Sequence, residues 1–179
     1  VSNPQNQSNT LTAPKLLKYL ITHKHWSPFE MVSITMDINT TRDIAHQIVR
    51  HRSFSFQEFS QRYADPTKDM GFITREARLQ DTKNRQNSTD DLGSDLKETM
   101  SLLIKKHFEE SLNIYNLLLA QGVAKECARF VLPQATQTRL YMSGSLRSWM
   151  HYIDLRSAHG TQKEHMEVAE AIRCIFTCQ

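Results

Sequence analysis

The sequence predicts one domain in which helices are mixed with a few strands, and two observations support this. Apolar residues recur at the spacing of amphipathic helices along much of the chain, whereas strict alternation of apolar and polar residues is confined to short runs. The 179 residues are 39% hydrophobic and 23% charged, which is typical of a soluble globular protein with a core. We expect this single domain to span residues 1–179 and to be trimmed at both ends. The absence of a first Met indicates residues missing upstream.

Charge and cysteine content argue against several classes of protein. No run of about 18 apolar residues exists, and the polar N-terminus lacks the apolar core of a signal peptide. The formal net charge of +3 is too small for wholesale binding to a nucleic-acid backbone. The three cysteines have no paired spacing, so we expect no disulfide framework, as is usual in the reducing cytosol, and no metal site. We therefore expect a cytoplasmic protein, or one of the host cytoplasm if the source is viral, with no membrane or nucleic-acid partner.

The chain begins with a predicted helix and strand. Residues 13–26 have helical spacing, with Thr12 as the N-cap. We expect Pro28 to break this helix, because a proline disfavours helix at the preceding residue, Ser27. Residues 30–38 alternate strictly between apolar and polar side chains, which predicts a half-buried strand.

A second helix is predicted over residues 40–52, with Thr40 as its capping residue. This helix would end with Arg50, His51 and Arg52 at successive positions, so their side chains would point about 100° apart. Three such groups on a regular helix cannot all hold one phosphate, but they can serve two ligands.

The middle of the chain is polar. Residues 56–63 alternate, so Glu58, Ser60 and Arg62 would share one face if this segment is extended. Residues 66–94 are polar and rich in turn formers, and we expect a mobile or functional loop there.

The C-terminal half is mainly helical. The clearest helix covers residues 95–121, closed by Gly122, and we expect it to serve as a scaffold or subunit interface with Leu103, Leu118 and Leu119 buried. It is followed by a short helix, a strand or extended link, and two final helices, at residues 124–133, 135–144, 145–156 and 161–176.

One short segment carries most of the chemical information. The sequence "RHRSFSFQEFSQRYAD", residues 50–65, places cationic and aromatic side chains around Glu58. Seven of the twelve arginines lie between Arg42 and Arg85. Because arginine binds phosphate through two parallel hydrogen bonds, this concentration indicates a site for an anionic ligand.

The same segment resembles the signature of the flavin-dependent thymidylate synthases, the ThyX family. Three further stretches resemble motifs of that family in order and spacing: "HKHWSPFE", "ECARFVLP", and "SLRSWMHYIDLR" followed by "TQKEH". The resemblance covers roughly residues 15–176, and four ordered motifs are far more specific than one.

The resemblance implies an α+β fold with a small, mostly antiparallel sheet and long helices. It also implies a methyltransferase of dTMP biosynthesis, which reductively methylates dUMP to dTMP. In the family, 5,10-methylenetetrahydrofolate donates the carbon, and FAD reduced by NADPH is the hydride source. Members are homotetramers with active sites shared between subunits.

The resemblance also implies roles for individual residues. The catalytic residues would be Arg156 and His25. FAD would contact Ser27, Arg50, His51, Arg52, Glu58, Ser145, Arg147 and His151. The substrate dUMP would contact Gln47, Arg50, Glu58, Phe59, Ser60, Gln61, Arg62, Arg129 and Arg156. No metal is expected.

The chain departs from the family pattern near its C-terminus. Ser145 stands where the family often has Asn, His151 replaces a later Asn, and Gly160 occupies the place of a frequent His. Ser60 is interpreted as a dUMP-binding hydroxyl rather than a nucleophile, since the sequence offers it no convincing His–Asp pair. The role of the segment "RLQDTKNRQNS", which resembles a loop of one subset of the family, stays open.

Two other functions remain as alternatives at this point. Basic residues interleaved with aromatics could bind RNA or single-stranded nucleic acid, although Glu58 inside the patch and the low net charge oppose this. The chain could also be a nucleotide-binding subunit without turnover.

Without the family resemblance, Phe54, Phe56 and Phe59 are interpreted as core residues rather than as residues that stack on a flavin.

Overall fold

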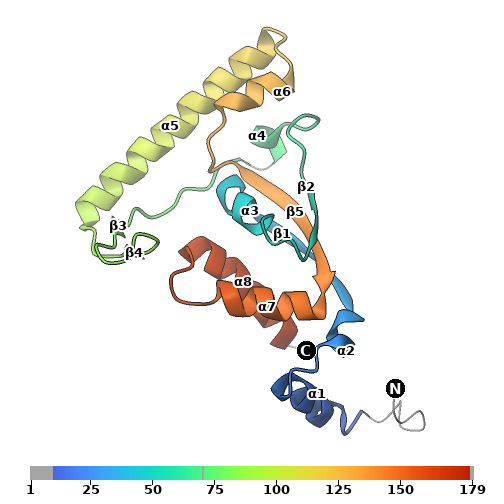
Figure 1. Ribbon diagram of the computed structural model, residues 1–179. Coiled ribbons are helices and arrows are strands. Elements are labelled where there is room, and N and C mark those ends of the chain that lie inside the picture. Colours follow the sequence, from blue (N-terminus) through green and yellow to red (C-terminus); the bar gives the residue numbers. More distant parts are fainter. Residues whose placement is uncertain (1–9, 70, 178–179) are drawn as a thin grey trace.

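The computed structural model describes residues 10–69 and 71–177 (Figure 1). Its elements, in chain order, are α1 Ala13–Thr22, α2 Ser27–Glu30, β1 Ser33–Thr41, α3 Arg42–Ile48, β2 Ser55–Glu58, α4 Pro66–Asp69, β3 Leu79–Gln80, β4 Ser88–Thr89, α5 Ser94–Ala120, α6 Lys125–Ala128, the 3₁₀ turn η2 Arg129–Val131, β5 Gln137–Ser145, α7 Leu146–Arg156 and α8 Lys163–Thr177. None of the helices within the described ranges is both long and apolar enough to cross a membrane.

A three-stranded antiparallel sheet in the order β1-β5-β2 lies at the centre of the fold. β5 is the middle strand and pairs with the whole of β1, from Ser33 opposite Ser145 to Thr41 opposite Gln137. The shorter β2 pairs with the other edge of β5. The expected α+β fold with a small antiparallel sheet is therefore confirmed, and the segment 135–144 is a strand rather than a link.

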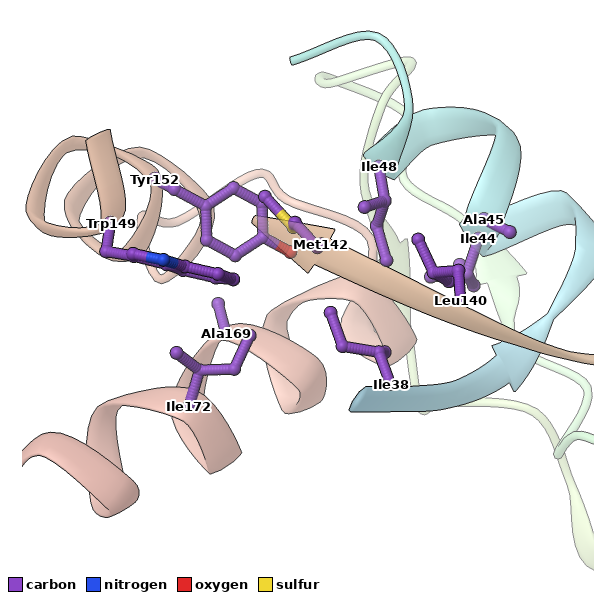
Figure 2. Close-up of a cluster of buried hydrophobic side chains, with 10 residues drawn as sticks. All are labelled: Ile38, Ile44, Ala45, Ile48, Leu140, Met142, Trp149, Tyr152, Ala169 and Ile172. Atoms are coloured by element: carbon purple, nitrogen blue, oxygen red, sulfur yellow. The ribbon is translucent and has the colours of Figure 1, made fainter. Parts of the chain in front are cut away.

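The hydrophobic core lies between one face of the sheet and the helices that cover it. Leu140 and Met142 of β5 are fully buried beneath side chains from α3, α7 and α8 (Figure 2). The apolar residues of the predicted alternating strand point to this face, which explains the period of two in the sequence. The buried cluster consists of Ile38, Ile44, Ala45, Ile48, Leu140, Met142, Trp149, Tyr152, Ala169 and Ile172.

The opposite face of the sheet is polar and exposed in the protomer. Arg139 of β5 donates to Asp37 of β1 over 2.9 Å and lies 5.4 Å from the centre of the Tyr141 ring. Thr35 donates to Ser143 across the same two strands, over 2.9 Å. These cross-strand pairs stabilise a sheet that has a covered face and an open one.

The helix α5 extends away from the sheet and packs against α6 and η2 (Figure 1). Ser111 of α5 donates to the carbonyl oxygen of Val131 over 2.6 Å, and the Phe72 and Phe108 rings lie 5.0 Å apart. Gly122 follows the helix with φ at 77°, as predicted for a C′ glycine. The expected burial of Leu103 is wrong in the protomer, where 55% of this residue is exposed, whereas Leu118 and Leu119 are half-buried.

Three local predictions differ from the structure. Ser27 and Pro28 begin the short α2 instead of breaking a helix, because proline is tolerated in a first turn, where its missing N–H has no partner to lose. Thr41 rather than Thr40 precedes α3. The helix α3 stops at Ile48, so the Arg-His-Arg triplet lies in turns beyond it.

The segment "RLQDTKNRQNS" forms a small hairpin in which β3 and β4 pair. Asp81 accepts from the backbone N–H groups of Lys83 and Asn84 and from the Asn87 side chain, at 2.8, 3.1 and 2.9 Å. The composition of this stretch predicts a loop, but these hydrogen bonds stabilise a hairpin. Its polar residues therefore have a structural role.

Gly144 of β5 permits a close approach by Phe54, the residue that leads from the Arg-His-Arg triplet into β2. A Cβ atom at Gly144 would lie 2.5 Å from Cδ1 of Phe54. The ring packs edge-on against Trp149, with centroids 4.8 Å apart, so it cannot move freely. We expect Gly144→Ala to lower the free energy of unfolding by about 1–3 kcal/mol in urea denaturation. Most of this cost should vanish in a Phe54→Leu background, and an unchanged midpoint for Gly144→Ala alone would contradict the prediction.

Candidate functional site

The Arg-His-Arg triplet follows α3 in a tight turn, where the N–H of His51 bonds the carbonyl oxygen of Ile48 over 3.0 Å. Arg50 and Arg52 are exposed, and neither forms an ion pair with any residue that the structure describes. Both guanidinium groups are therefore available to an anionic ligand.

His51 points the other way, toward the helices α7 and α8. The Nε of Arg156 donates to Nε2 of His51 over 2.9 Å, and the Tyr152 ring meets the imidazole edge-on, with centroids 4.9 Å apart. Burial, followed by the charges of Arg156 and His151, lowers the pKa of His51 to about 4. His51 is therefore a neutral acceptor near pH 7, and its role as a phosphate-binding cation is not supported.

A cavity of about 910 Å³ is lined in part by Ser53, two residues beyond His51, and by His151, whose charge helps to lower the pKa of His51. Its walls combine polar groups, including Ser53, Arg147 and His151, with the apolar surfaces of Trp26 and Phe176. Cavities of ~300–1,000 Å³ are typical of sites for small molecules and cofactors. Among the predicted flavin contacts, Arg147 and His151 line this cavity directly.

Glu30 of α2 holds two of the predicted flavin residues in place. Ser145 donates to one carboxylate oxygen over 2.6 Å, and Arg147 donates to the other over 2.8 Å. These hydrogen bonds hold the pKa of Glu30 below its usual value. Glu30 belongs to the motif "HWSPFE", so its two hydrogen bonds connect this motif to "SLRSWMHYIDLR". Glu30 was assigned no role from the sequence, although its position in a family-like motif could have indicated one.

The donor set of this cavity fits FAD. A dinucleotide with a pyrophosphate needs fixed cationic donors together with apolar walls for its ring systems. Arg147 and His151 supply polar groups, the exposed Arg50 and Arg52 lie on the turn next to Ser53, and Trp26 supplies an aromatic wall. Arg147 is paired with Glu30, so a phosphate would have to share or replace that partner.

Glu58, predicted to contact both ligands, belongs to a second group of residues at the end of β2. It accepts from Arg42 over 3.4 Å and from Thr138 over 2.9 Å. Phe59 follows it and donates its backbone N–H to the carbonyl oxygen of Arg139. The strand ends at Glu58, so Glu58, Ser60 and Arg62 do not share the face of one strand as expected.

A third group contains the predicted phosphate contacts at the end of α6. Arg62 forms an exposed ion pair with Glu126 at 2.8 Å, and the Nε of Arg129 donates to the carbonyl oxygen of Glu126. Ser60 accepts from the backbone of Arg62. Gln61 is only 4% exposed, and its Nε2 has no hydrogen-bond partner within the described residues. A buried amide without a partner is costly, and a ligand could satisfy it.

The other predicted catalytic residue lies apart from these groups. His25 is exposed between α1 and α2, where its ring is 6.1 Å from that of Tyr19 and 6.2 Å from that of His23. Ser27 is also exposed, and neither residue lines the cavity. One protomer thus brings Arg156 to His51, and Arg147 and His151 to the cavity, but it places His25 in neither group.

The half-buried His51 and the fully buried His165 of α8 predict a pH dependence of folding stability. Burial is the largest cause that lowers the pKa of both His51 and His165, in each case to about 4. In the unfolded chain both bind protons below about pH 6.5, so the unfolded state gains protons that the folded state refuses. We expect the urea midpoint to fall as pH decreases from about 7 to about 5.5. The exposed His107→Phe should keep this slope, and a midpoint independent of pH would contradict the prediction.

Solved structures with the same fold define the class of the protein. The UMP/dUMP methylase PolB from Streptomyces cacaoi, crystallised with 5-Br UMP, has a TM-score of 0.82 and 27% sequence identity, over 94% of this chain and 79% of PolB. The structure with 5-Br dUMP gives a TM-score of 0.83 and 26% identity, over 99% of this chain and 80% of PolB. The fold therefore places the chain in an α+β structural class that includes PolB.

Sequence comparisons identify the family. The family model described as "Thymidylate synthase complementing protein" matches residues 1–178. A "Flavin-dependent thymidylate synthase" from Synechocystis sp. is 52% identical over 176 residues, which is 98% of this chain and 80% of that protein. A "Probable flavin-dependent thymidylate synthase" from Paramecium bursaria Chlorella virus 1 is 51% identical over 98% of this chain and 81% of its own length. The chain belongs to the family of the flavin-dependent thymidylate synthases.

Proposed function

We infer that the protein converts dUMP to dTMP with FAD as its cofactor. The observation that carries this inference is the cavity of about 910 Å³ lined by Arg147 and His151, in a chain of this family in which Arg156 also donates to His51. We further propose that 5,10-methylenetetrahydrofolate donates the carbon and that NADPH supplies the reducing equivalents. We propose that this takes place in a single domain in the cytoplasm, or in the host cytoplasm if the source is viral.

In this proposal, each group of residues has one task. FAD, when bound, supplies the hydride that reduces the transferred carbon to a methyl group. Arg147, His151 and the exposed Arg50 and Arg52 bind and orient it. Arg156 faces the uracil ring of dUMP and stabilises negative charge that develops there. His51 accepts from Arg156 and so holds the guanidinium plane in position.

The phosphate of dUMP is assigned to the groups at the ends of β2 and α6. Arg62 and Arg129 offer cationic donors, Ser60 a hydroxyl, and Gln61 an unsatisfied amide. Ser60 serves as a ligand rather than a nucleophile. Glu58 bonds Arg42 and Thr138 and would orient the nucleotide from the sheet side.

We propose a homotetramer in which neighbouring subunits complete each active site. The predicted contacts form separate groups in one protomer, with His25 apart from the rest, which supports a site built from more than one subunit. The long helix α5 has exposed apolar residues, among them Leu102, Leu103 and Leu117, that an interface would cover. Size-exclusion chromatography with light scattering would test the assembly.

Flavin uptake and turnover test the proposed function. We expect the purified protein to be yellow or to bind added FAD stoichiometrically, to oxidise NADPH, and to form dTMP from dUMP and methylenetetrahydrofolate. Flavin binding without dTMP formation would favour a nucleotide-binding subunit without turnover. A colourless protein that retards RNA in a gel would favour the nucleic-acid-binding alternative, which the family and structure matches do not support.

The ion pair between Arg62 and Glu126 allows the phosphate assignment to be tested. Arg62→Ala removes a charge-assisted partner worth about 1.5–3 kcal/mol, so the Kd for dUMP should rise roughly ten- to hundredfold in calorimetric titration. The matched variant Glu126→Gln removes only the competing carboxylate and should leave the affinity unchanged or higher. Equal dUMP affinity of Arg62→Ala and the unsubstituted protein would reject the assignment.

A further inference from the structure

A continuous chain of side-chain hydrogen bonds runs through the interior from α7 to the start of α8. The Tyr152 hydroxyl lies 3.0 Å from Nε2 of His165, and Nδ1 of His165 lies 3.2 Å from Oε1 of Gln47. The Nε2 of Gln47 donates to Oε1 of Gln162 over 2.7 Å, and the Nε2 of Gln162 donates to Glu164 over 2.9 Å. None of these contacts is part of the roles assigned so far, apart from Gln47 itself as a predicted dUMP contact.

The direction of the bonds is fixed from the Glu164 end. Arg78 pairs with the Glu164 carboxylate at 2.8 Å. Burial opposes ionisation of this carboxyl, but hydrogen bonds from Gln162 and Arg78 hold its pKa below the usual value. An ionised carboxylate only accepts, so Gln162 turns its NH₂ group toward Glu164 and its oxygen toward Gln47. Gln47 must then present its own NH₂ group to Gln162 and its oxygen to His165.

This order leaves one tautomer for His165. Nδ1 must carry the proton in order to donate to the Gln47 oxygen. His165 is fully buried, and burial is the main cause that lowers its pKa to about 4, so Nε2 is unprotonated near pH 7 and accepts from Tyr152. The other tautomer would bring two lone pairs together at Gln47.

We propose that His165 is a positioning residue for the nucleotide. It does not contact dUMP itself but holds the Gln47 amide in a single orientation. The inference rests on the proposed function, which places Gln47 against dUMP. His165 has no exposed surface and acts only through its two hydrogen-bond partners. Gln47 is half-buried and keeps one N–H and one lone pair free after its two bonds. A fixed amide offers dUMP the same donor and acceptor in every molecule, which lowers the ordering cost of binding.

The tautomer of His165 can be measured without any nucleotide. Nitrogen-15 NMR of the histidine-labelled protein should show a protonated Nδ1 and an unprotonated Nε2 for His165, with no titration between about pH 8 and about pH 5.5. The signal is assigned by its loss in His165→Asn. A protonated Nε2 in the native protein would overturn the inference, whatever the protein binds.

Nucleotide affinity tests the consequence for dUMP. His165→Phe keeps an aromatic ring at this position but removes the hydrogen bonds to Tyr152 and Gln47. The Kd for dUMP should then rise about three- to tenfold, the loss expected for one neutral hydrogen bond. His165→Asn can place an N–H near the former Nδ1 position and should recover most of the affinity. In a Gln47→Ala background, His165→Phe should have no further effect. The exposed His107→Phe serves as the matched control and should bind dUMP normally.

The outcomes separate this inference from the proposed function. If the unsubstituted protein binds dUMP and His165→Phe binds it equally well, the inference fails and the function stands. If the effects of His165→Phe and Gln47→Ala simply add, His165 does not act through Gln47, and the inference also fails. If the unsubstituted protein does not bind dUMP, the proposed function and the nucleotide role of His165 fail together. Should His165→Phe be too unstable to purify, the comparison of His165→Asn with Gln47→Ala and the NMR measurement still decide.

Discussion

Arg156→Ala is expected to lower kcat for dTMP formation about 10²–10³-fold, the usual loss when one preorganised donor to a developing negative charge is removed. Arg156 is half-buried, and the only side-chain hydrogen bond that it forms among the described residues is the one from Nε to His51. It takes part in no ion pair of the described chain, so its terminal nitrogens are available to a substrate. Single-turnover kinetics would separate this loss from any change in dUMP affinity.

Arg156→Lys is the matched variant, because it keeps the positive charge and loses the planar arrangement of donors. We expect it to remain at least about tenfold impaired if two parallel hydrogen bonds matter. A second readout comes from His51, whose pKa the Arg156 charge helps to lower. That pKa should rise in Arg156→Ala, although burial, the larger cause, remains. Normal kcat in either variant would show that Arg156 is structural.

Trp149→Ala is expected to lower the free energy of unfolding by about 3–5 kcal/mol, a large part of the stability of an ordinary domain. Trp149 is fully buried, and its ring packs edge-on against Phe54 and Tyr152, with centroids 4.8 and 5.9 Å away. Its Nε1 also donates to the carbonyl oxygen of Ile34 over 3.0 Å. The substitution therefore leaves both a cavity and a backbone acceptor without its partner. Urea denaturation followed by circular dichroism measures the effect.

Trp149→Phe separates these two contributions. Phenylalanine keeps most of the apolar contact but cannot donate to Ile34, so its cost should be close to that of one hydrogen bond with a small cavity, about 1–2 kcal/mol. A Trp149→Ala variant no less stable than Trp149→Phe would contradict the placement of this ring in the core.

The sheet and the long helices could be predicted from the sequence because their signals are local. The alternation of residues 33–41 places every second side chain on the core face of β1. The stretch 137–145 alternates in the same way, and Gly122 marks the end of α5 by a conformation that glycine adopts without strain. In the two strands the alternation reflects the burial of one face, and in the helix the glycine marks the C-terminal end.

The turn after α3 could not be predicted in this way. The helical pattern continues beyond Ile48, but the chain must turn there so that Phe54 can reach the space above Gly144 and pack on Trp149. The backbone accordingly changes to short-range bonds, such as that from Arg50 N–H to the carbonyl oxygen of Gln47. Tertiary packing overrides local helix propensity at this position.

The ion-pair partners and the protonation states of the site residues could not be predicted from the sequence either. Arg62 meets Glu126, and Arg147 meets Glu30, across 64 and 117 positions of the chain. His51 stands between two arginines in the sequence, yet it is neutral because the fold turns its ring inward beside Arg156. Which cation is free and which is compensated depends on contacts that no local pattern encodes.

The carboxylates Glu30 and Glu126 have a consequence for how ligands would enter. Because Arg147 and Arg62 are each paired with a carboxylate of the protein itself, a nucleotide phosphate must share or replace that partner rather than bind an unpaired cation. Such an exchange leaves the local sum of charges less altered, so ionic strength should weaken binding less steeply than for uncompensated cations. At Arg147, sulfate or chloride would gain little, whereas a molecule that also fills the adjoining cavity could displace the Glu30 carboxylate.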